Sequence, residues 1–476
     1  MTYPWWSILP FVLMLASIAI MPLAPQTKHM WESNKFQLGL ALLLGLPVAA
    51  AVFFLDDPWR VGHAVYEYIQ FIMLLFALFV VSGGIFLKGD IAATPRNNTT
   101  FLAIGGVVAS FVGTTGAAML LIRPLLNTNK QRKHKVHTVL FTIFVVANCG
   151  GLLTPLGDPP LFLGLLRGVP FTWTFNLLPY WAFVNILLLL CYYCLDKRFY
   201  GAEDPAAVRM DRSSVQPLSL RGKRNFLWFG LIIAAVAFAP SMDLHAIEEG
   251  HATLGAWIPT REIIMLIAAA GSFFLTPKDI RYGDNEFEWG PIAEVAALFI
   301  GIFLTMIPAL EYLGQKAGSL PLNEITFYLF TGSLSAVLDN APTYATFYEM
   351  AAQLPPGEGV AMIGTTPAVP ENYLVTISLG AVFFGAMTYI GNGPNFMVKS
   401  VAESRGVAMP SFGGYVVHTF TFLLPILLAN MCLFMVDSLL VKGVGVAITA
   451  FVVLRALNDL RKAGNPDVVD TAAPKF

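Results

Sequence analysis

The amino-acid sequence predicts an all-α polytopic membrane protein with about 11 transmembrane helices and two re-entrant hairpins. Apolar residues make up 56% of the 476 residues and charged residues only 12%, whereas about a quarter of a soluble domain is charged. The apolar residues gather in runs of about 20, the length that an α-helix needs to cross the hydrocarbon core. The net charge of -1 gives no indication of a nucleic-acid partner, so the expected surroundings are the lipid bilayer.

The apolar runs predict where the crossings lie. Eleven are expected, at residues 5–24, 36–55, 68–87, 138–165, 170–195, 225–241, 261–276, 291–313, 371–398, 411–436 and 438–457. Two further apolar segments, 99–125 and 320–348, are interrupted at their middle by residues 113–116 and 339–342, which disfavour a helix. We interpret both segments as re-entrant hairpins.

The positions of the basic residues predict the orientation, because Lys and Arg accumulate on the cytoplasmic side of a membrane. With the N-terminus outside and the C-terminus in the cytoplasm, most of the 29 Lys and Arg residues fall in inner loops. We therefore expect a multi-pass protein of the inner (cytoplasmic) membrane of the cell. His134 and His137 are expected to be solvated in a basic inner loop. Four ionisable residues near outer ends are expected to be interfacial: His63, Glu67, Arg167 and Arg261.

An internal repeat divides the chain. Residues 110–117 resemble residues 335–342, and residues 154–162 resemble residues 388–396. These matches predict a first repeat at 1–198, a cytoplasmic linker at 199–224, a second repeat at 225–437, and an extra C-terminal span with a cytoplasmic tail at 438–476. Each repeat holds five crossings, an odd number, so the second is expected to be inverted relative to the first.

The repeat places four helix breaks in matched positions, at the two hairpin tips and at residues 157–160 and 391–394. Inside lipid a broken helix persists only where protein or a water-filled cavity satisfies the freed backbone groups. Half-helix N-termini offer partial positive charge, and unwound carbonyls coordinate cations, so the breaks predict an ion or substrate site. Its candidate residues carry hard oxygen or amide groups, or are glycines of the breaks: Thr114, Thr115, Asn148, Thr154, Gly157 and Asp158 in the first repeat, and Asp339, Asn340, Thr343, Thr388, Gly391, Asn392 and Asn395 in the second.

Two carboxylates stand out among these candidates. An intramembrane carboxylate costs about 2.5–3.5 kcal/mol and usually has a function. The alternative role of Asp158 or Asp339 is that of a helix N-cap. The repeat aligns Asp339 with Thr114 and Asp158 with Asn392, so each repeat supplies one carboxylate on a different element, which predicts two unequal sites.

The motifs at residues 148–160, 335–343 and 389–395 resemble those of the ion transporter superfamily, which includes NhaD-type sodium/proton antiporters, arsenite permeases, citrate–metal transporters and divalent anion/sodium symporters. The resemblance implies a homodimer in which the hairpins and broken spans move as an elevator against a static scaffold. It also implies one sodium ion near Thr114 and Asp158 and another near Asp339 and Asn392. The dicarboxylate symporters carry Ser-Asn-Thr at both hairpin tips, where this chain has Gly-Thr-Thr and Asp-Asn-Ala.

A cavity with two carboxylates and no intramembrane Lys or Arg favours cations. We therefore expect a secondary active transporter, a sodium/proton antiporter, with sodium as transported or coupling ion and no other cofactor. The alternative is a proton- or sodium-coupled citrate or dicarboxylate transporter. An enzyme is not expected, because the sequence has no His-Glu-x-x-His motif and no Gly-x-Ser-x-Gly elbow.

Overall fold

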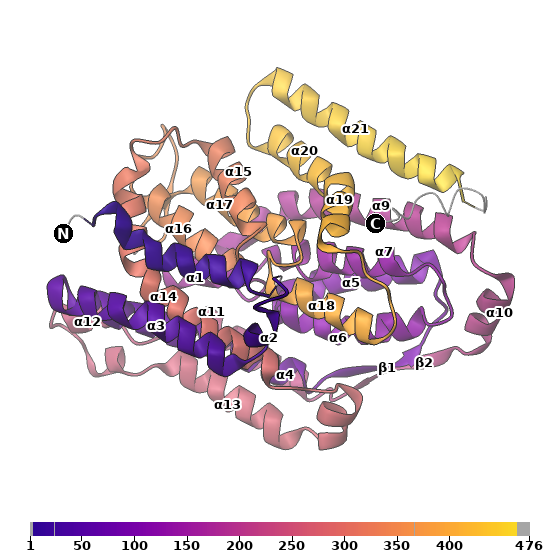
Figure 1. Cartoon of the computed structure of the whole chain (residues 1–476), viewed down its shortest axis with the longest axis horizontal. Helices are drawn as coiled ribbons and strands as arrows, with labels where there is room; N and C mark the ends of the chain where they lie inside the picture. The colour runs from indigo at the N-terminus through magenta and orange to yellow at the C-terminus, as the bar shows by residue number, and fades with distance from the viewer. Residues whose placement is uncertain (1–2, 23, 366, 464–476) are drawn as a thin grey trace.

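The computed structural model describes residues 3–22, 24–365 and 367–463, and these residues form a bundle of helices with two small sheets (Figure 1). The elements of the first half are η1 Trp5–Ile8, α1 Leu9–Ile20, α2 Lys28–Trp31, α3 Asn34–Leu55, α4 Pro58–Ser82, β1 Phe86–Asp90, α5 Pro95–Val112, α6 Thr114–Thr128, α7 Val136–Phe141, η2 Thr142–Val146, η3 Cys149–Leu152, α8 Pro159–Leu166, η4 Phe171–Leu177, α9 Leu178–Tyr200 and α10 Pro205–Ser213. Those of the second half are β2 Gln216–Arg221, α11 Asn225–Phe238, α12 Leu244–Glu248, η5 Leu254–Trp257, α13 Thr260–Leu275, η6 Asp279–Asp284, α14 Gly290–Ala317, α15 Glu324–Ser335, α16 Asn340–Ala352, β3 Met362–Ile363, β4 Val369–Pro370, α17 Glu371–Phe384, η7 Gly385–Met387, α18 Gly393–Ser404, α19 Phe412–Phe422, α20 Leu424–Phe434 and α21 Leu439–Arg461.

The apolar helices identify the chain as an all-α polytopic membrane protein. Among the described residues, six helical segments are long and apolar enough to cross a membrane: Asn34–Leu55, Pro58–Ser82, Phe171–Tyr200, Gly290–Ala317, Phe412–Phe434 and Leu439–Arg461. Shorter apolar helices occupy Trp5–Ile20, Val136–Leu152, Asn225–Phe238 and Glu371–Met387. All ten overlap predicted crossings. Residues 464–476 of the predicted tail lie outside the described residues.

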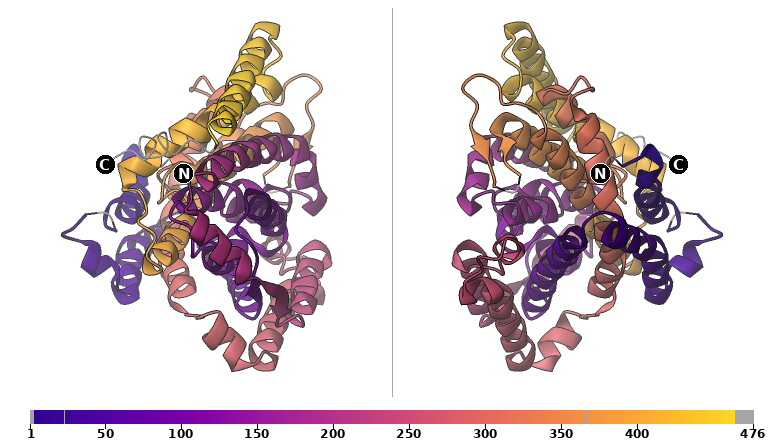
Figure 2. Two further views of the ribbon diagram at one scale, coloured as in Figure 1. Left: turned by 90° about the vertical axis from the view of Figure 1, so that its right-hand side faces the viewer. Right: turned by 90° about the vertical axis from the view of Figure 1, so that its left-hand side faces the viewer.

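The helices of the two halves pack against one another. Helix α14 lies against α3 and α4, where Phe71 stacks on Phe299 with ring centroids 4.8 Å apart. A Cβ atom added to Gly301 would lie 2.7 Å from that of Ala41, so this contact requires glycine. Such close approach at small residues is typical of membrane helices. Figure 2 shows α21, in yellow, at one end of the cross-section and the salmon segment around α13 at the opposite end.

Both interrupted segments have the predicted form of helix, break and helix. Gly113 alone separates α5 from α6, and its φ of 85° lies in the left-handed region that favours glycine. Residues 336–339 separate α15 from α16. The re-entrant placement of both hairpins stays a prediction.

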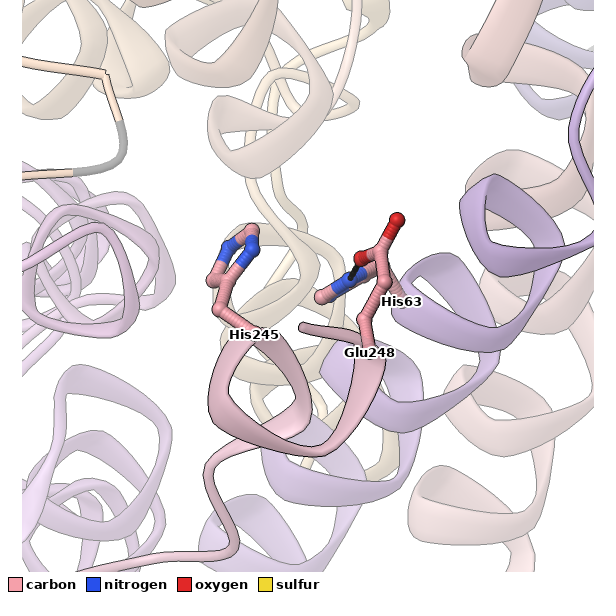
Figure 3. A group of neighbouring side chains, drawn as sticks. All are labelled: His63, His245 and Glu248. Carbon is pink, nitrogen blue, oxygen red and sulfur yellow. Dashed lines mark hydrogen bonds and ion pairs between the residues drawn. The ribbon is translucent and has the colours of Figure 1, made fainter. Parts of the chain in front are cut away.

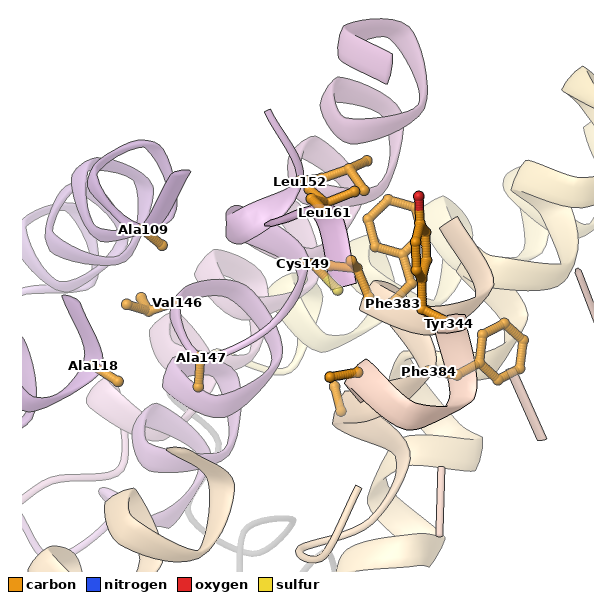
Figure 4. Close-up of a cluster of buried hydrophobic side chains, with 14 of the residues drawn as sticks. Ala109, Ala118, Val146, Ala147, Cys149, Leu152, Leu161, Tyr344, Phe383 and Phe384 are labelled. Carbon is orange, nitrogen blue, oxygen red and sulfur yellow. The ribbon is translucent and has the colours of Figure 1, made fainter. Parts of the chain in front are cut away.

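Apolar side chains from the two halves meet beside these breaks (Figure 4). Cys149 and Leu161, from η3 and α8, are buried in one core with Tyr344 and Phe383, from α16 and α17. The core holds the broken segments of the two halves next to each other.

A small antiparallel sheet was not expected. Strand β2, from the predicted linker, pairs with β1 of the first half, and α10 precedes it in the same linker. The linker is therefore folded back onto the bundle.

Three ionisable residues of the predicted loops and interfaces are buried in the protein, and the expectation that His137 is solvated was wrong. The interfacial placement of Arg167 and Arg261 stays a prediction. His137 is 7% exposed, and its Nε2 lies 2.7 Å from Asp196 Oδ1 on α9. Arg167 lies over the ring of Tyr348, and Arg261 pairs with its neighbouring glutamate. The partners of His137 and Arg167 are distant in the sequence, so loop position alone could not reveal burial.

Candidate functional site

Four helix N-termini meet at one carboxylate. Helix α6 begins at Thr114 and α16 begins at Asn340, the second helices of the two hairpins. Helices α8 and α18 follow the two breaks, and their N-caps are Asp158 and Asn392. Because all four residues belong to one hydrogen-bonded group, the four helix N-termini lie close together.

The carboxylate of Asp158 is the centre of this group. Thr114 Oγ1 donates to Asp158 Oδ1 at 2.9 Å, and Asn340 Nδ2 donates to Oδ2 at 2.7 Å. Asn392 Nδ2 lies 3.3 Å from Oδ1. Asp158 is 1% exposed, and within the described residues no Lys, Arg or His forms an ion pair with it. Neutral donors and helix N-termini therefore surround this carboxyl group.

A chain of asparagine amides leads to the same carboxylate. Asn395 Nδ2 donates to two backbone carbonyls, Gly385 O at 2.7 Å and Thr388 O at 2.9 Å. Its oxygen accepts from Asn148 Nδ2 at 2.6 Å, and the Asn148 oxygen accepts from Asn392 Nδ2 at 3.1 Å. A carbonyl can only accept, so it fixes the orientation of each amide in turn. The amide group of Asn392 is thereby turned toward Asp158.

Ser335 contacts the remaining amide, that of Asn340, and was not among the predicted candidates. Its hydroxyl lies 2.6 Å from both Asn340 Oδ1 and the carbonyl of Ala381 and can donate its single proton to one of them at a time, while Asn340 Nδ2 donates to Asp158. The signal for Ser335 was its match with Ser110 in the repeat.

Two of the predicted threonines secure the breaks to the hairpins. Thr154 Oγ1 donates to the carbonyl of Ser110, and Thr388 Oγ1 donates to that of Ala336. Each hydroxyl also accepts, at 3.2 Å, from the backbone N–H two residues further on. The same hydrogen-bond pattern thus holds both breaks against their hairpins.

The two predicted glycines permit this close approach. A Cβ atom on Gly157 would overlap the backbone of Gly151, and one on Gly391 would overlap the carbonyl of Gly385. Thr343 lies inside α16 and donates to the carbonyl of Asp339 at 3.1 Å. These residues shape the backbone around the carboxylate.

Asp339 does not bond to the other candidate side chains. Its Oδ1 accepts from the backbone N–H of Ala341 at 3.2 Å, so Asp339 is the N-cap of α16, as in the alternative stated above. The structure joins Asn340 and Asn392 to Asp158, although the family resemblance placed both with Asp339 at a second sodium site.

A cavity of about 90 Å³ lies beside the group. One wall consists of apolar side chains of α4 and α14, including Leu78 and Ile292. The other wall is formed by the N-terminal ends of α6, α8 and α18, with Thr115 and Gly393 among its residues. The cavity is therefore apolar on one side and bordered by helix N-termini on the other.

Residues 1–435 match a family described as "putative citrate transport", which covers most of the chain. No curated protein matches the chain.

Proposed function

We propose, from the premise that the chain belongs to this putative citrate transport family, that it is a cation-coupled transporter of citrate or a closely related carboxylate. Membership supports a secondary transporter and a role that is not enzymatic. It favours the alternative of the sequence analysis over sodium/proton antiport. The cargo and the coupling cation belong to the proposal.

The convergence of four helix N-termini on Asp158 carries this proposal. Helix N-termini attract anions, by about 0.3–1 kcal/mol each at exposed sites and up to about 2 kcal/mol when partly buried. Without a cation, the negative charge of Asp158 offsets the positive electrostatic potential of the helix N-termini. When sodium or a proton neutralises Asp158, the potential becomes available to a carboxylate group in the adjacent cavity. Cation binding would thus promote citrate binding, which is the thermodynamic basis of coupled transport.

Thr114 is the residue suited to respond to the cation. A hydroxyl both donates and accepts, so Thr114 can rotate away from donation and present its oxygen to sodium or to a protonated Asp158. The Nδ2 group of Asn340, which faces Asp158, can only donate and lacks this freedom. Carboxylate and hydroxyl oxygens are hard ligands that suit sodium.

The position of the cavity suits an elevator motion. It lies between α4 and α14 on one side and α6, α8 and α18 on the other, so displacement of the hairpins and broken segments along α4 and α14 would carry the site across the membrane. The homodimer, the inverted repeat and the predicted orientation are part of this proposal. With the N-terminus outside, the cavity lies toward the inner face.

Sodium/proton antiport is the second candidate. It is favoured by the absence, within the described residues, of an ion-paired Lys, Arg or His at Asp158, because such a site can carry a cation without cargo. Proteoliposomes distinguish the two functions. We expect uptake of labelled citrate that requires an inward sodium or proton gradient. Lumenal alkalinisation or acidification on a sodium pulse, without citrate and with no citrate uptake, would establish antiport.

A further inference from the structure

A second group of ligating side chains lies away from Asp158, between α4 and the short helix α12 (Figure 3). His63 Nε2 lies 3.1 Å from Glu248 Oε2, and the rings of His63 and His245 are 4.4 Å apart between centroids. One ligand atom from each of the three side chains falls within 4.8 Å of the others. The side chains of His63 and Glu248 are 26% and 32% exposed, so dissolved ions can reach them.

The backbone around this group is held in place. His245 and Glu248 stand three residues apart on α12, so they face the same side of the helix. The side chain of Asp243 caps α12 by accepting from the N–H of Ala246 at 3.0 Å. Tyr66, one turn after His63, lies 2.7 Å from Ser241 and ties this segment to α4. The three ligands are therefore brought together by contacts that do not need a metal.

Two imidazoles and a carboxylate form the ligand set of an open zinc site, in which water or another ligand fills the fourth position. Zn–N and Zn–O bonds of about 2.0–2.2 Å place tetrahedral ligands about 3.3 Å apart. The separation of 3.1 Å between His63 and Glu248 already meets this geometry. His245 is exposed, so a rotation of its side chain can complete the set.

We propose that His63, His245 and Glu248 bind one Zn²⁺ ion per chain and that the ion fastens the segment around α12 to α4. The site is distinct from the Asp158 group, and it does not depend on which cargo is transported. In the predicted orientation it faces the outside. Imidazole ligands also select zinc over magnesium or calcium, which prefer oxygen.

The test uses the full-length protein in detergent, with any polyhistidine tag removed. Zn²⁺ binding is measured by titration calorimetry, and Co²⁺ is added as a spectroscopic probe because tetrahedral cobalt absorbs visible light strongly. We expect one ion per chain, and slower hydrogen exchange at residues 244–248 when zinc is present. His245→Ala should weaken binding by more than the roughly 10- to 100-fold that loss of an outer-shell partner costs a metal site.

A matched control lies in the same segment. His251 and Glu249 are exposed and 2.8 Å apart, but within the described residues they belong to no three-ligand group. His251→Ala should leave the affinity unchanged. Equal binding by wild type and His245→Ala, or no binding by the correctly folded wild type, would overturn the proposal. Glu248→Gln keeps the size of the side chain, so a folding defect is not expected, and it should also weaken zinc binding.

Discussion

The two broken segments, 154–158 and 388–392, share their backbone design and differ in charge. In both, a threonine is bonded to a hairpin carbonyl and a glycine allows close backbone contact. The last position carries a carboxylate in the first segment, Asp158, and an amide in the second, Asn392. The amide then donates to the carboxylate of the other segment. Two segments with a similar backbone thus form one hydrogen-bonded group around a single carboxylate, that of Asp158.

This difference indicates how a repeated fold acquires a function. The shared threonines and glycines position the helix ends. The difference between Asp158 and Asn392, at one matched position, determines which repeat carries the negative charge. The hairpin tips differ as well, because the sequence match pairs Thr114 with Asp339, whereas the structure places Asn340 beside the carboxylate that Thr114 contacts. The connection between α15 and α16, residues 336–339, is also longer than the single residue between α5 and α6.

The largest effect is expected from Asp158→Asn. It removes the carboxylate of the hydrogen-bonded group, to which the coupling cation would bind. A cation can drive transport only if it binds one conformation of the transporter more tightly than the other. Gradient-driven uptake of citrate should therefore fall by at least about 100-fold. Uptake into proteoliposomes measures this. Near-normal uptake by a folded variant would show that the coupling cation binds elsewhere.

The next effect concerns the two asparagines that donate to Asp158. Asn340→Ala removes a hydrogen bond of 2.7 Å to a charged acceptor, and such bonds contribute about 1.5–3 kcal/mol to the free energy of unfolding. Asn392→Ala removes longer bonds, of 3.1 Å to Asn148 and 3.3 Å to Asp158 and to the carbonyl of Ala147, and should cost less. Thermal unfolding of the purified variants tests the order, and a larger loss in Asn392→Ala would contradict the geometry.

The shared framework predicts similar losses in the two breaks. Gly157→Ala and Gly391→Ala each force a Cβ atom into backbone, which should destabilise by about 1–3 kcal/mol as overpacking does. Gly393→Ala is the matched control, because an added Cβ meets nothing within 4 Å. Melting temperatures measure the three variants. If Gly157→Ala lowered the melting temperature and Gly391→Ala did not, the two breaks would not share the same backbone framework.

The smallest effect is expected from Asp339→Asn. Asparagine caps helices about as well as aspartate, so stability should change by no more than about 0.5 kcal/mol, and uptake should stay within about threefold. The same unfolding and uptake assays apply. A loss of uptake as large as that of Asp158→Asn would support the two-carboxylate site that the sequence predicts.

The spans and breaks were predictable because they depend on local properties. Hydrophobic length locates a crossing, and glycine or proline interrupts it wherever the helix folds in space. The break around Asp158 is nevertheless longer than predicted, since it begins near Asn148 after the π-helical turn η2. Local composition does not determine where such a turn ends.

The contacts of the site were not predictable in the same way. Asn340 and Asn392 lie 182 and 234 residues from Asp158 in the sequence, and only the packing of the two halves brings them together. The burial of His137 and the grouping of His63 with Glu248 likewise depend on helices that are distant along the chain. Residue type and repeat position identified the candidates, whereas tertiary structure determined which of them bond to one another.

Citrate binding to purified wild type and Asp158→Asn, with and without sodium and at neutral and acidic pH, tests the central claim most directly. An asparagine mimics the neutralised carboxylate in charge. The account predicts that wild type binds citrate only when sodium or acid is present, and that Asp158→Asn binds it under every condition. Citrate binding by Asp158→Asn that still requires the cation would contradict the assignment of Asp158 as the coupling group.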